Sequence, residues 1–120
     1  MQRQPDQSWK LLSSNDSDKE VPTAVVMTAT WGLLHLVEGD LELGQEFYNE
    51  AKRLASTLGN KELARLVSQK MHLELARAFY RAGDRSVARK HLQQGLAIRD
   101  GMDFYHRDLQ ILDKNLRLSE

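Results

Sequence analysis

Histidine is the residue type in this chain that is best suited to metal binding or proton transfer. It occurs four times, at His35, His72, His91 and His106. No two of these histidines are four residues apart, and there is no H-E-x-x-H motif. The chain has no cysteine, and it lacks a P-loop, a G-x-G-x-x-G loop and a nucleophile elbow. The sequence therefore predicts a non-enzymatic protein without a metal or cofactor. An enzyme would need an unforeseen constellation of His72, Glu74 or Asp84.

Five basic side chains gather around one predicted turn at residues 83–84. They are Arg77, Arg81, Arg85, Arg89 and Lys90. Arg77 and Arg81 are four residues apart and share a helix face, where they repel each other unless an anionic group lies nearby. That group could come from a bound acidic peptide or phosphate, or from the chain itself, through Glu74, Asp84 or a neighbouring helix. The cluster is also the basis of an alternative function, that of a regulator associated with nucleic acid.

The charge balance argues against nucleic acid as the main partner. Seventeen Lys and Arg offset seventeen Asp and Glu, so the formal net charge is zero. A protein held to nucleic acid through phosphate contacts carries an excess of positive charge at the contact surface. The charge is uneven along the chain, however, at −4 for residues 1–60 and +4 for residues 61–120.

The apolar pattern predicts an all-α fold with five helices, over residues 22–38, 41–58, 61–82, 85–99 and 104–117. Two antiparallel hairpins and a C-terminal capping helix account for these elements. Residues 1–20 are polar and predict a flexible tail before a helical domain over residues 21–120. The longest apolar stretch, residues 24–37, is shorter than the roughly 20 residues that span a bilayer. We therefore expect a cytoplasmic protein that does not insert into membranes.

The two predicted hairpins repeat at a spacing of 44 residues. The turn signals Gly39-Asp40 and Gly83-Asp84 coincide at that offset, where Gly ends one helix and Asp begins the next. Small residues recur at equivalent positions and would let two helices approach closely, while larger ones fill the space beside them. The equivalent pairs are Gly32 and Ala76, His35 and Phe79, Gly44 and Ala88, Tyr48 and Leu92, and Ala51 and Gly95.

This spacing resembles the tetratricopeptide repeat, a helix–turn–helix unit, over about residues 24–100. The segments AKRLASTLGN (51–60) and LARAFYRAGD (75–84) are similar to the long-unit variety that occurs in kinesin light chains and bacterial regulators. The first unit departs from the pattern at His35, where an aromatic residue is usual, and at Gly44, where Ala is usual. Neither unit has the usual closing Pro. A closed helical bundle without repeats is the alternative fold.

The resemblance implies that the first helix of each unit lines a groove that binds a helix or an extended peptide. The implied groove positions are apolar in the first unit and largely basic in the second. They are Val26, Ala29, Leu33, Leu36, Val37, Lys70, Leu73, Arg77, Tyr80 and Arg81. The carboxylate clamp of chaperone-binding members is not expected, because Ala29 and Leu33 stand at its positions. We therefore expect an adaptor, scaffold or regulatory subunit whose partner is an amphipathic helix or a segment with acidic flanks.

The helix predicted at residues 22–38 carries apolar side chains in nearly every direction, as a helix buried on all sides does. At the end of a two-unit stack, however, one of its faces would lack a neighbour. Trp9, Leu11 and Leu12 of the tail could cover that face as a lid. A second copy of the chain, a different protein or further repeats could also cover it. Among these we expect self-association into a homodimer.

Overall fold

Only helices form the fold over the part of the chain that the computed structural model describes, residues 22–98 and 105–118. They are α2 (Thr23–Val37), α3 (Leu41–Thr57), α4 (Lys61–Arg81), α5 (Arg85–Ala97) and α6 (His106–Leu118). Each begins and ends within two residues of the range that the sequence predicts. The helices α2–α3 and α4–α5 form antiparallel hairpins, and α6 packs on α5 and α4. The prediction of two hairpins followed by a C-terminal helix is confirmed.

Some of the sequence predictions concern residues outside these ranges. They include the tail over residues 1–20, with its possible lid of Trp9, Leu11 and Leu12, and the expected start of the last helix at residue 104. In the structure α6 begins at His106. None of the helices within residues 22–98 and 105–118 is long and apolar enough to cross a membrane.

Three turns of the same construction join helices α2, α3, α4 and α5. In each turn a glycine with positive φ ends one helix, as at Gly39 with φ of 92°. The next residue, Asp40, donates its backbone N–H to the carbonyl oxygen of His35 at 2.9 Å. Its carboxylate accepts a hydrogen bond from a backbone N–H of the following helix at 3.3 Å. The same bonds recur in the turns at residues 58–60 and 82–84, so a Gly-Asx pair sets every connection from α2 to α5.

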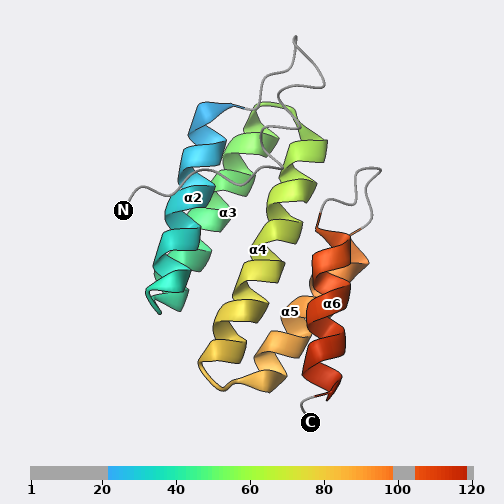
Figure 1. Ribbon diagram of the computed structural model, residues 1–120. Coiled ribbons are helices and arrows are strands. Elements are labelled where there is room, and N and C mark those ends of the chain that lie inside the picture. The colour runs from blue at the N-terminus through green and yellow to red at the C-terminus, as the bar shows by residue number, and fades with distance from the viewer. Residues whose placement is uncertain (1–21, 99–104, 119–120) are drawn as a thin grey trace.

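The helices lie in two layers, with α2, α4 and α6 in one layer and α3 and α5 behind it (Figure 1). Helix α4 occupies the centre and contacts each of the other four described helices. Its side chains are buried around most of its circumference, among them Leu66, Leu73 and Leu75. Helices α2 and α6 lie at opposite edges of the front layer, where each keeps one exposed face.

The helices α2 and α3 approach so closely that no side chain fits between them where Gly32 meets Gly44. A Cβ atom built on Gly44 would lie 2.9 Å from the carbonyl oxygen of Gly32 and would overlap the side chain of Leu36. A Cβ atom built on Gly32 would lie 2.8 Å from the buried Tyr48 ring. The small residues predicted at these two positions are therefore required by direct contact between the backbones.

Each hairpin also contains a stacked pair of one histidine and one phenylalanine. In the first hairpin, His35 stacks on Phe47 with ring centres 5.2 Å apart. In the second, Phe79 stacks on His91 with ring centres 5.7 Å apart. Phe47 and His91 are 44 residues apart, as His35 and Phe79 are, so the two hairpins repeat the contact with the ring types exchanged.

Gly44→Ala should destabilise the fold, although alanine is the better helix former. In a helix interior alanine is normally more favourable than glycine by about 1 kcal/mol. Here the added methyl group overlaps Leu36 and the α2 backbone, so we expect the free energy of unfolding to fall by about 1–3 kcal/mol. Urea denaturation followed by circular dichroism measures it. Asn49→Ala, on the exposed side of the same helix, is the control and should change stability by less than about 0.5 kcal/mol. A stabilising Gly44→Ala would contradict the close contact.

Candidate functional site

The side chains predicted to line a groove do not share one environment in the structure. Ala29, Leu36, Lys70 and Leu73 are buried, so the structure does not support contacts between these four and a partner. Leu36 packs on Gly44 of α3. Lys70 and Leu73 belong to α4, which is covered by α2 on one side and α6 on the other. The groove positions were assigned from the resemblance alone, and a resemblance does not show how completely neighbouring helices cover α4.

The other predicted groove positions keep some exposure on α2 and α4. Val26, Leu33, Arg77 and Tyr80 are half-buried, and Val37 and Arg81 are exposed. Val26, Leu33 and Tyr80 pack against the core, so their exposed parts are limited. These six positions remain candidates for partner contacts, with apolar groups from α2 and mainly basic groups from α4.

A buried ion pair occupies the basic side of the predicted groove. The Lys70 ammonium nitrogen lies 2.7 Å from Oε2 of Glu74, one turn further along α4, and both side chains are buried. The same carboxylate oxygen accepts a hydrogen bond from Arg77 at 3.1 Å. The Lys70 ammonium group also lies 5.0 Å from the centre of the Tyr105 ring, which precedes α6. Glu74 is therefore an anionic neighbour of Arg77, and Lys70 joins α4 to the start of α6.

The outer face of α2 carries the largest exposed apolar side chains in the described part of the first hairpin's helices. Met27 is 55% exposed and Trp31 is 53% exposed. Leu34 continues the stripe and is half-buried, and Glu38 ends it. These residues follow one another at intervals of four, three and four, which places them on one helix face. We call this stripe of Met27, Trp31, Leu34 and Glu38 the α2 face.

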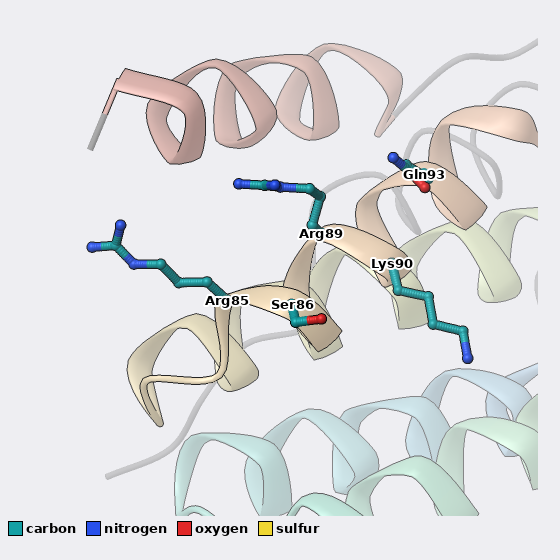
Figure 2. Close-up of a pocket in the computed structure, with 5 residues that line it drawn as sticks. All are labelled: Arg85, Ser86, Arg89, Lys90 and Gln93. Atoms are coloured by element: carbon teal, nitrogen blue, oxygen red, sulfur yellow. The ribbon is translucent and has the colours of Figure 1, made fainter. Parts of the chain in front are cut away.

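A shallow pocket of about 300 Å³ runs along α5. Its lining residues all belong to that helix and are Arg85, Ser86, Arg89, Lys90 and Gln93. Figure 2 shows that Arg85 and Arg89 extend to one side of α5, whereas Lys90 extends to the other. Arg85 also lies over the Tyr80 ring, 5.8 Å from its centre. The positive groups diverge, so the pocket offers a basic surface rather than a set of groups that converge on one anion.

Two histidines that are distant in the sequence meet between α4 and α5. The Nδ1 atoms of His72 and His91 lie 3.1 Å apart, so one ring donates its N–H to the bare nitrogen of the other. Burial lowers the pKa of His72 to about 4, with positive charge on His91 and Lys52 as smaller causes. Burial also lowers the pKa of His91. While both rings are neutral, the pair forms a hydrogen bond that joins α4 to α5.

The acidic and histidine side chains of the described residues do not gather into a metal site. Across residues 22–98 and 105–118, no group of three or more His, Cys, Asp or Glu side chains is placed to hold a metal ion. Comparison of the chain with protein-family models, with curated proteins and with solved structures found no match. The function is therefore inferred from the exposed faces of the helices, chiefly the α2 face.

Acidification should destabilise the fold, because burial opposes protonation of His72. The unfolded chain binds this proton near pH 6.5, whereas the folded chain binds it only near pH 4. The stability contribution is therefore complete above pH 6.5 and is lost as the pH falls from 6.5 towards 4. We expect a loss of about 1–3 kcal/mol over that window, measured by urea denaturation at several pH values.

His72→Gln is the variant that tests this assignment, because glutamine can still hydrogen-bond to His91 but does not titrate. It should reduce the dependence of stability on pH between 4 and 6.5. His106→Gln, at the start of α6, is the control and should leave that dependence in place. If His72→Gln keeps the full pH dependence, another group is responsible for it.

Proposed function

We propose that this chain is a non-enzymatic protein interaction module that binds an amphipathic helix on the α2 face. The observation that carries the proposal is the half-exposed Trp31, next to Met27 on a helix whose opposite side is buried in the core. Large exposed apolar groups that adjoin one another are typical of interaction sites. Tryptophan is also enriched among the residues that dominate binding energy.

The charge at the end of the α2 face selects the chemistry of the partner. Glu38 ends the stripe, and Asp40 and Glu42 follow it, all three exposed. A helix with apolar residues at intervals of four and three and with a basic residue at one end would match this face. The predicted groove positions on α4 have the opposite preference, because Arg77 and Arg81 favour acidic flanks. The charge of the bound segment therefore distinguishes the two surfaces.

The resemblance to tetratricopeptide repeats supports the same class of function. Two hairpins with equivalent turns and equivalent ring stacks are what a repeated helix–turn–helix unit would produce. Proteins of that family bind other proteins and act as adaptors, scaffolds or regulatory subunits. Under this proposal the module also self-associates, since α2 has an apolar face that no other described helix covers.

Binding of a model peptide tests the proposal, with Trp31 as the reporter. In the full chain with Trp9→Phe, Trp31 is the only tryptophan. We expect its fluorescence to shift to shorter wavelength when a 14-residue helical peptide with leucines at four- and three-residue intervals and lysine flanks is added. The protein is kept near 5 μM and the peptide is raised to about 1 mM, which covers weak binding.

Two controls show whether the α2 face is responsible for the shift. Met27→Glu should remove the shift, because it places a charge in the apolar stripe. Glu46→Gln, on the exposed side of α3, should leave the shift unchanged. The same peptide with glutamate flanks should bind more weakly than the lysine form. If neither peptide changes the emission, the α2 face is not a docking surface for helices.

A regulator associated with nucleic acid is the second candidate, because Arg85, Arg89 and Lys90 give α5 a basic surface. Attraction to phosphates weakens steeply as salt rises. The candidate predicts that a fluorescent oligonucleotide binds the full chain at 50 mM salt and is released by 200 mM. Arg89→Gln with Lys90→Gln should weaken this binding at least tenfold, and Met27→Glu should not. If the chain does not bind the oligonucleotide at 50 mM salt, this candidate fails.

A further inference from the structure

Helix α6, at the opposite edge of the molecule from α2 (Figure 1), carries a second exposed stripe with the same spacing. Its members are Arg107, Ile111, Lys114 and Leu118, at intervals of four, three and four residues. Ile111 is 49% exposed and Leu118 is 75% exposed, while Leu109 and Leu116 face inward and are buried. We call the stripe the α6 face. It has the chemistry that the α2 face favours, because its apolar residues alternate with basic ones.

The two faces match in charge when the helices run antiparallel. In that register Arg107 comes opposite Glu38, where an ion pair can form, and Lys114 comes opposite Trp31, where its ammonium group can lie over the indole ring. Within the described residues, Glu38, Arg107 and Lys114 make no ion pair. In the parallel register Arg107 would face Met27 and lose its acidic counterpart. Charge therefore favours the antiparallel arrangement.

The same antiparallel register also pairs the apolar residues. Ile111 comes opposite Leu34, and Leu118 comes opposite Met27. Because both stripes have the same intervals, each covers about 17 Å of helix at a rise of about 1.5 Å per residue. All four pairs can therefore form together along straight helices, without a bend or a shift in register.

We propose that the α2 face binds the α6 face of a second copy of this chain, with the two helices antiparallel. The proposal rests on the proposed function and names the partner of its docking surface. The two faces of one copy cannot meet, because α2 and α6 lie on opposite sides of α4 and run in the same direction (Figure 1). The α2–α3 hairpin, residues 22–60, carries five acidic and two basic residues. The α4–α5 hairpin, residues 61–98, carries three acidic and eight basic residues, so unlike ends of two copies attract.

This contact joins two different surfaces, so each bound pair still has one α2 face and one α6 face open. Such head-to-tail contacts extend into chains or close into rings. One helix against one helix covers less than the roughly 1,200 Å² of a standard stable interface. We therefore expect weak association, in which the average mass rises from 13.8 kDa through two copies and beyond as the concentration approaches about 1 mM.

Sedimentation of two complementary variants of the full chain tests the contact. The α2 variant carries Met27→Glu and Trp31→Glu, and the α6 variant carries Ile111→Glu and Leu118→Glu. Each variant alone has only one working face and should remain at the mass of one chain. A 1:1 mixture should form a species of two chains and grow no further. Circular dichroism checks that both variants keep the helical content of the unmodified chain.

A charge exchange tests the antiparallel register without removing apolar groups. Glu38→Lys and Arg107→Glu should each reduce association at least threefold, because each places like charges opposite each other. The double variant, Glu38→Lys with Arg107→Glu, should recover the association. Salt at 0.5 M should weaken the association of the unmodified chain. Asp108→Lys, an exposed charge beside the stripe, is the control and should change association less than Arg107→Glu does.

Other occupants of the α2 face give different outcomes, each of which overturns the proposal. If α2 pairs with α2, the α6 variant still self-associates. If residues 1–21 act as a lid or a different protein is the partner, the unmodified chain stays at the mass of one chain up to about 1 mM. The peptide titration then decides the proposed function independently, because it needs no self-association. Binding of the peptide without self-association removes only the choice of partner.

Discussion

The burial of α4 is the constraint on which the rest of the structure depends. This helix contacts each of the other four described helices, so polar groups on it must find partners inside the fold. The side-chain amide of Gln69 donates to the carbonyl oxygens of Gly95 and Ile98 at the end of α5. Lys70 and Glu74 neutralise each other, and Lys70 reaches the Tyr105 ring before α6. The polar residues of α4 therefore connect it to α5 through Gln69 and to the start of α6 through Lys70, and among the side-chain atoms of the described residues only Oε1 of Gln69 is buried without a hydrogen-bond partner.

Most of the hairpin architecture could be predicted because it is encoded over short distances. A Gly-Asx pair ends one helix and begins the next through bonds within about five residues. Small residues such as Gly32 and Gly44 mark where helix backbones touch. The 44-residue spacing paired His35 with Phe79 as equivalent rings, but the stacking of these rings on Phe47 and His91 was not predicted. Phe47 and His91 also lie 44 residues apart, but their different ring types hide this equivalence.

The candidate site was harder to predict, because exposure depends on which helices cover which faces. The apolar character of residues 23–37 on all sides was visible in the sequence. Only the packing distinguishes inward positions such as Val25 and Leu36 from the outward Trp31. Lys70 and Leu73 were assigned to a groove through a resemblance, yet α4 is covered on both sides and buries them. Helix periodicity therefore predicted which residues share a face, but the exposure of each face had to come from the tertiary contacts.

Among the described helices, α2 and α6 differ in the composition of the outer face that no other described helix covers. In a stack of helical units, a polar outer surface normally keeps the end soluble. Helix α6 follows this rule in part, because Arg107 and Lys114 separate its exposed apolar residues. Helix α2 does not, since Met27 and Trp31 stand next to each other on its outer side. Apolar groups stabilise a fold in proportion to the area that folding removes from water. The half of Trp31 that stays exposed therefore contributes nothing to folding, and burial against the partner that we propose would give its position a physical reason.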